Sequence, residues 1–413
     1  MIARFCLYSI LKNLRFFEQF FILYLLAPQS VGGSGLAYFQ MGVLTGYQKL
    51  VTGLLEVPTG FLADQWGRRR ALVTCFGCYV GAFPVYALAS SGSDAQRFGL
   101  LVLAQTLFGI GEAFRTGTHK AIMLDWADAA HPPGGATRVV AVTRFWSKLT
   151  SGVSAVAGGI LLWQAGSFTP LFWCATVPAA LGMFLIASYP AALDGEYRRE
   201  QEQHARPGWK SRLFRLRGRP GMLFLFVQSV LFESQIKLGQ IYLQPFLERG
   251  LAAREIVVVG GLGAVAIGLY YLVQDGLGGV ASWLSPRFEA HAGGADRAVA
   301  RVHWLAALAA GLVALSLGGS WPLVGAAGFL ALAVLQNVRR PMFVSLFARV
   351  MDKPQRAATL SLESQGRSFA VAILAPLTGW IADLAGLGAA LAVIAGLLAL
   401  AALMGRGRPG VAG

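Results

Sequence analysis

Charged side chains inside long apolar segments are the groups of this sequence that could do chemistry. Glu112 and Glu233 lie near the middle of two such segments, and each is followed on the same helical face by a base, Arg115 or Lys237. Burial raises the pKa of a carboxylate and a neighbouring base lowers it, so the pKa can lie near neutral pH. Glu112 and Glu233 are therefore candidates for proton coupling. The same spacing also suits static ion pairs, and the sequence leaves both interpretations open.

Other polar residues at similar depth are candidates for lining a substrate cavity. An excess of bases among them favours an anionic substrate, although some bases could instead neutralise the carbonyl groups at helix ends. His119 suits either a proton relay or a packed, hydrogen-bonded side chain. These cavity candidates are Lys49, Arg115, His119, Lys237, Gln240 and Arg340. The sequence has no hydrolase or metalloprotease motif and no P-loop, so we predict no catalytic residue, metal site, cofactor or enzyme activity.

The elements that position these groups are membrane helices. The chain has 413 residues, of which 55% are hydrophobic and 13% charged, and its mean hydropathy is +0.57. A bilayer-spanning helix needs about 20 apolar residues. Windows of that length recur at about 8–29, 38–60, 71–90, 98–125, 139–163, 169–189, 221–246, 255–281, 302–318, 321–348, 358–382 and 387–404. We therefore predict an all-α integral membrane protein with twelve transmembrane helices.

The charges divide these spans into two kinds. The third, sixth, ninth and twelfth spans carry no charged residue in their interiors, whereas every other span carries at least one. Because a charge facing lipid costs at least ~2.5–3.5 kcal/mol, the charged spans must face protein or water. The long polar stretch separates six spans from six and predicts a bundle at 1–190, a cytoplasmic linker at 191–220 and a second bundle at 221–413.

The net charge of +15 is best explained by membrane orientation. With both termini cytoplasmic, Lys and Arg concentrate in the cytoplasmic loops, and only Arg97, Arg249 and Arg254 fall in the loops on the other side. The positive charge therefore predicts contact with the lipid bilayer and not with nucleic acid.

Residues 60–70, with the sequence Gly-Phe-Leu-Ala-Asp-Gln-Trp-Gly-Arg-Arg-Arg, join the second and third predicted spans. We expect a tight hinge here, because three consecutive arginines must stay in water. The segment resembles the signature loop of the major facilitator superfamily. That resemblance implies a conformational gate made of Gly60, Asp64, Gly67 and Arg68, with Asp125 at the inner end of the fourth span. In the family, this network latches the outward-facing state.

The resemblance implies two pseudo-symmetric six-helix bundles that transport a small molecule by alternating access. It favours proton-coupled efflux by a monomer in the bacterial cytoplasmic (inner) membrane. Two departures weaken the similarity to antiporters: Gln105 precedes Gly109-Ile110-Gly111, and the fifth span lacks a Gly-Pro pair. Proton-coupled uptake of an anionic metabolite and a membrane sensor that does not transport are the alternatives. A look-alike of the signature at 379–386 lacks arginines, and we interpret it as a packing and turn element.

Overall fold

The computed structural model describes residues 1–130, 135–190, 193, 220–318, 321–349 and 356–405. Every regular element in these ranges is a helix, and the described residues contain no strand. Nine helical stretches within them are long and apolar enough to cross a membrane. The prediction of an all-α membrane protein is therefore confirmed, whereas the count of twelve spans stays a prediction. The predicted linker at 191–220 lies outside the described residues except for Leu193 and Pro220.

The chain divides into two compact units, which we describe separately. The first unit comprises Met1–Leu36, Tyr47–His204 and Leu251–Asp275, and the second comprises Ala37–Gly46, Ala205–Gly250 and Gly276–Gly413. Helices α3 (Tyr38–Trp66) and α11 (Leu262–Ala292) contribute a long segment to each unit, and α10 (Pro220–Ala252) contributes Leu251 and Ala252 to the first. This division differs from a simple cut in the middle of the sequence, and the predicted boundaries of the two bundles remain untested.

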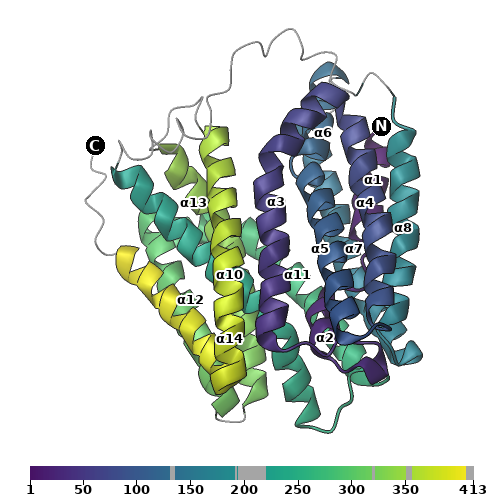
Figure 1. The fold of residues 1–413 in the computed structure, drawn as a ribbon. Helices are drawn as coiled ribbons and strands as arrows, with labels where there is room; N and C mark the ends of the chain where they lie inside the picture. The colour runs from purple at the N-terminus through teal and green to yellow at the C-terminus, as the bar shows by residue number, and fades with distance from the viewer. Residues whose placement is uncertain (131–134, 191–192, 194–219, 319–320, 350–355, 406–413) are drawn as a thin grey trace. The chain divides into compact units, whose positions relative to one another are not determined.

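The first unit is a helical bundle in which α4 packs against both α5 and α8, while α1 packs against α7 (Figure 1). An aromatic cluster of Phe17, Tyr24, Phe83, Tyr86 and Phe172 fills its interior, with edge-on contacts such as Tyr24 on Phe172. Its helices are α1 (Ile2–Asn13), α2 (Phe21–Leu26), α4 (Arg68–Ala89), α5 (Asp94–Arg115), α6 (Thr118–Ala130), α7 (Gly135–Ala165) and α8 (Thr169–Ala187).

The first predicted span, 8–29, is not one continuous helix, and this corrects the prediction. Helix α1 ends at Asn13, and Leu14 leaves the helical conformation with φ −77° and ψ 62°. A single 3-10 turn at Glu18–Phe20 then leads into α2. The fourth predicted span is also divided, because Gly117 adopts φ 80° between α5 and α6. Both breaks lie next to charged residues of the candidate site.

The second unit contains α10 (Pro220–Ala252), α12 (Ala295–Gly318), α13 (Pro322–Arg349) and α14 (Arg356–Met404). Helix α12 packs against both α13 and α14. The long α14 consists of two helices, because Gly386 interrupts it with φ 85° and ψ 167°. Only glycine adopts this conformation without strain. The interruption lies between the predicted eleventh and twelfth spans.

Two helices that contain the charge-free sixth and ninth predicted spans expose regular apolar stripes. On α8, Trp173, Val177, Leu181 and Phe184 are each about half exposed or more, and they recur every three or four residues. On α12, Leu305, Leu308, Leu312 and Leu315 repeat the pattern. This spacing places each set on one helical face. Such faces suit contact with acyl chains, as the absence of charge from the sixth and ninth spans predicts.

Candidate functional site

In the first unit, several donors surround a carboxylate whose side chain is only 15% exposed. Arg15 donates a hydrogen bond of 2.8 Å to Glu112, Tyr79 donates one of 2.6 Å, and Arg115 binds both carboxylate oxygens at 3.2 and 2.5 Å. The Arg15 guanidinium also stacks on the rings of Tyr79 and Phe108. We name this group the Glu112 cluster; its members are Arg15, Tyr79, Glu112 and Arg115.

Local backbone geometry places these side chains next to Glu112. Arg15 lies in the non-helical segment between α1 and the 3-10 turn at Glu18–Phe20, so it can reach α5 from the broken first span. Arg115 is the last residue of α5, where its positive charge also interacts favourably with the unpaired carbonyl groups of the helix end. The i, i+3 spacing brings Glu112 and Arg115 together, as the sequence suggests. Arg15 and Tyr79 are not among the residues that the sequence analysis predicts for the site. Arg15 could have been included, because it is a charged residue inside an apolar span.

His119 lies in an aromatic environment in α6. Its ring stacks on Tyr8 at a centroid distance of 3.5 Å and meets Phe5 edge-on, and its Nε2 atom is 3.5 Å from the Tyr189 hydroxyl. The side chain is buried. This environment favours the packed interpretation of His119 over a proton relay.

The second unit buries a larger charge cluster. Glu233 on α10 accepts hydrogen bonds of 2.9 Å from both Arg339 and Gln336 on α13. Arg340 binds both oxygens of Glu363 on α14, at 2.9 and 3.1 Å. Glu233 and Glu363 are 2% and 0% exposed. We name this group the Glu233 cluster; its members are Ser229, Glu233, Arg339, Arg340, Glu363 and Arg367.

Ser229 links the two ion pairs of this cluster. Its hydroxyl donates to Glu363 at 2.9 Å and accepts from Arg339 at 3.2 Å. Arg339 is fully buried between the rings of Phe232 and Phe343 and also donates to His303 at 3.1 Å. A guanidinium in this position has both hydrogen-bond and ring partners, which is the usual condition for burying a charge.

Some contacts of the candidate residues differ from those that the sequence suggested. The sequence suggested a pair between Glu233 and Lys237, whereas the structure gives Glu233 the partner Arg339, which lies 106 positions away. Lys49 is half-buried on α3, and Lys237 and Gln240 are half-buried on α10. Their assignment to a substrate cavity stays a prediction. Arg340 joins the Glu233 cluster, together with Glu363 and Arg367, which the candidate list omitted.

The predicted gate residues come together around one arginine. Arg68, at the start of α4, contacts the carboxylate of Asp125 on α6 and lies 3.8 Å from that of Asp64. Residues 60–66 continue α3 as helix, so the predicted hinge shrinks to Gly67, with φ 99° and ψ 136°. Gly60 is exposed, and a Cβ atom there would meet nothing within 4 Å. The structure thus assembles Asp64, Arg68 and Asp125, while their gating role stays a prediction.

The look-alike segment at 379–386 makes a defined contact in the second unit. The Asp383 carboxylate accepts hydrogen bonds from the backbone N–H groups of Tyr38 and Phe39, at 2.9 and 2.8 Å. These are the first residues of α3, where unpaired N–H groups attract an anion. A Cβ atom on Gly379 would overlap the Tyr38 backbone, so this glycine permits the close approach. The segment acts as a packing and capping element.

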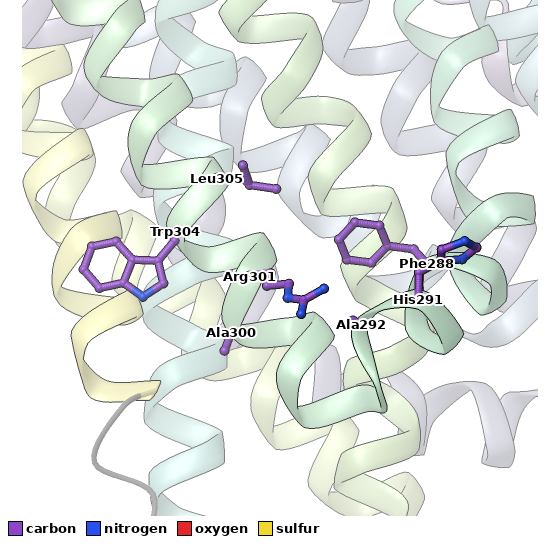
Figure 2. A pocket seen from close by; sticks show the side chains of 7 residues that line it. All are labelled: Phe288, His291, Ala292, Ala300, Arg301, Trp304 and Leu305. Atoms are coloured by element: carbon purple, nitrogen blue, oxygen red, sulfur yellow. The ribbon is translucent and has the colours of Figure 1, made fainter.

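One pocket is lined by residues that belong to neither charge cluster. Figure 2 shows it between the end of α11 and the start of α12, with a volume of about 540 Å³. Its lining is Phe288, His291, Ala292, Ala300, Arg301, Trp304 and Leu305. None of these belongs to the Glu112 or Glu233 cluster. We therefore assign the candidate site to the buried clusters and not to this pocket.

A profile of known families decides the identity of the chain. The profile described as Major Facilitator Superfamily matches residues 9–294. The chain belongs to the major facilitator superfamily. Superfamily membership places the protein among multi-pass membrane transporters of small molecules. The family suggested by the signature segment is thus confirmed. No curated protein matches the chain.

Solved structures of other transporters share the superfamily fold. A mutant of the nucleoside transporter NupG has a TM-score of 0.77 at 11% identity, with 98% of both chains covered. A D-xylose-proton symporter has a TM-score of 0.73 at 11% identity and covers 98% of this chain and 96% of its own. A mutant peptide transporter POT in complex with sulfate has a TM-score of 0.71 at 15% identity, with 98% and 93% covered. At these identities the likeness establishes the fold alone.

Proposed function

We propose that this protein is a proton-coupled secondary transporter that moves a small molecule by alternating access. In this proposal it has twelve spans in two pseudo-symmetric six-helix bundles, 1–190 and 221–413, with both termini in the cytoplasm. It acts as a monomer in the bacterial inner membrane. Membership in a transporter superfamily supports the mechanism, and the bias of Lys and Arg toward one side supports the orientation.

The observation that carries the proposal is a buried cluster of carboxylates and arginines in each unit. Glu112 and Glu233 lie in helical stretches that are apolar enough to span a membrane, and each accepts hydrogen bonds from arginine. Charged groups inside a bilayer are costly and usually mark a path for a solute or proton. We propose that protonation of these two carboxylates releases their arginines during transport.

We propose efflux as the direction, because the signature segment is characteristic of many exporters in the family. Uptake of an anionic metabolite is the second candidate, and the surplus of arginine over carboxylate in both clusters favours it. The D-xylose-proton symporter, one of the structural neighbours, is named as coupled to protons. A membrane sensor is the third candidate, and the assembly of Asp64, Arg68 and Asp125 favours a moving transporter over it.

The test uses wild-type protein in proteoliposomes that contain the pH-sensitive dye pyranine. Solutes of different charge are added outside, with ethidium as the cationic probe and benzoate paired with benzamide as the anionic and neutral probes. The proposal predicts that at least one solute moves protons only in vesicles that contain protein. For a given orientation, the direction of proton movement separates antiport from symport. No protein-dependent flux of any solute across a wider screen would favour the sensor.

A further inference from the structure

The Glu233 cluster contains more positive than negative charge. Three guanidinium groups, those of Arg339, Arg340 and Arg367, share the two carboxylates of Glu233 and Glu363. His303 accepts a hydrogen bond from Arg339 at its Nε2 atom, so that nitrogen carries no proton. Among the described residues, no third carboxylate lies within ion-pair distance of Arg340 or Arg367. Within the described residues, the cluster therefore holds one more positive than negative charge.

Arg367 is the member with unused hydrogen-bonding capacity. Its Nη1 atom is 3.7 Å from Glu233, whereas Arg339 and Arg340 bind their carboxylates at 2.9 Å. Its Nη2 atom donates to Ser364 at 3.0 Å. Its Nε atom is buried and has no hydrogen-bond partner. A buried donor without a partner loses the solvation of water and gains nothing in return.

Arg340 has the most exposed side chain of the cluster. Its side chain is 36% exposed and that of Arg367 is 15% exposed, whereas both carboxylates are nearly inaccessible. A solute approaching the cluster therefore meets guanidinium groups before it meets carboxylates. The planar guanidinium fork matches the geometry of a carboxylate or other oxyanion and can bind it with two parallel hydrogen bonds.

These observations point to an anion. We infer that Arg367, together with Arg340, forms the binding site for a negatively charged group of the transported solute, a carboxylate or another oxyanion. The bound group supplies the missing negative charge and accepts hydrogen bonds from the Arg367 guanidinium. This inference rests on the proposed transport function, specifies its substrate class, and holds for either direction of transport.

The arginines of the Glu233 cluster have an alternative explanation, in which their role is structural only. Water that reaches the exposed side of Arg340 could solvate the extra charge, and the cluster would then serve only to hold α10, α13 and α14 together. The two explanations differ in one respect. A structural cluster has no preference between a carboxylate and its neutral amide, whereas an anion site discriminates between solutes of the same shape by charge.

The experiment measures binding to the full-length protein in detergent by thermal unfolding. The probes are matched pairs, benzoate with benzamide and succinate with succinamide, together with inorganic phosphate and sulfate, at constant ionic strength. The expected result is that at least one anion raises the Tm in a saturable manner while its neutral amide does not. Equal effects of each acid and its amide, or no effect from any anion, would overturn the inference.

Variants then locate the site. Arg367→Gln should raise the half-saturating anion concentration about ten- to a hundredfold, because it removes charged hydrogen-bond donors. Arg301→Gln is the matched control: it removes an exposed arginine from the pocket in Figure 2 and should leave binding unchanged. If Arg367→Gln does not fold, Arg367→Lys keeps the charge but loses the fork and should bind more weakly. Binding by Arg367→Gln or Arg367→Lys with wild-type affinity would contradict the assignment.

The proteoliposome assay keeps this result separate from the proposed function. If ethidium or benzamide moves with protons while no anion binds, the transport function stands and the anion site is wrong. If an anion binds in detergent through Arg367 but no solute crosses the membrane, the site stands and transport is wrong.

Discussion

At the scale of single residues, each unit encloses carboxylates that arginines hold with hydrogen bonds. Glu112 has donors from three different segments, and Glu233 has donors from α13. Burying a charged group costs its solvation by water, and the numerous hydrogen bonds of these groups offset that cost. It also means that removing one partner should cost far more than removing a pair.

The fully buried Arg339 offers a test of this cost. Arg339→Met should destabilise the protein by about 3–5 kcal/mol, because it deprives the Glu233 carboxylate of its buried partner. The double variant Arg339→Met/Glu233→Gln should recover part of that loss, since the buried carboxylate that was left with only the longer ion-pair contacts to Arg367 and Arg340, at 3.7 and 3.9 Å, is then gone. Thermal unfolding in detergent measures both. A double variant less stable than the single variant would show that the pairing does not dominate.

The sequence predicted some of these contacts and missed others for a clear reason. Helical spacing brought Glu112 next to Arg115, because residues three apart share a face. No local rule connects Glu233 with Arg339 or Glu112 with Arg15, since these pairs depend on how separate helices pack. Intramembrane charge therefore identified candidate residues but not most of their partners.

At the scale of elements, helix ends and breaks position the charged groups. The break after Asn13 was not predictable, because Leu14-Arg15-Phe16-Phe17 contains neither glycine nor proline. Hydropathy indicated apolar helical segments but not where a helix breaks within them.

Gly67 and Gly60 form a matched pair of glycines in the signature segment. Gly67→Ala should cost about 1–3 kcal/mol, because φ 99° is strained for a residue with a Cβ atom. Gly60→Ala should leave stability unchanged or raise it by about 0.5–1 kcal/mol, since it lies in the α3 helix with open space around it. Thermal unfolding compares the two variants. Equal losses in both would mean that Gly67 is not the turn.

The cap that Asp383 places on α3 can be tested by hydrogen exchange. Asp383→Ala should reduce the protection of the Tyr38 and Phe39 amides by about 0.5–2 kcal/mol, because both lose their acceptor. Asp383→Asn keeps one acceptor oxygen and should fall between Asp383→Ala and wild type. Unchanged exchange at these two amides in Asp383→Ala would show that the capping contact is absent in solution.

At the scale of the whole molecule, the chain is a member of the major facilitator superfamily, and every regular element in its described residues is a helix. Composition and hydropathy were sufficient to predict this class, because only helices or closed barrels satisfy their backbone groups in lipid. The identity of the solute depends on side chains from many helices, which no single segment of sequence reveals. Our proposal that the solute carries a negative charge rests on the arginine surplus of the Glu233 cluster.

The central claim is that the buried carboxylates couple transport to protons, and one comparison tests it most directly. Proteoliposomes with wild-type protein, Glu112→Gln, Glu233→Gln or the control Glu255→Gln, which neutralises an exposed carboxylate, are assayed for flux driven by a pH gradient and for solute exchange without a gradient. We predict that Glu112→Gln and Glu233→Gln lose gradient-driven flux but retain exchange, while Glu255→Gln behaves as wild type. Gradient-driven flux at wild-type rates in both Glu112→Gln and Glu233→Gln would contradict the account.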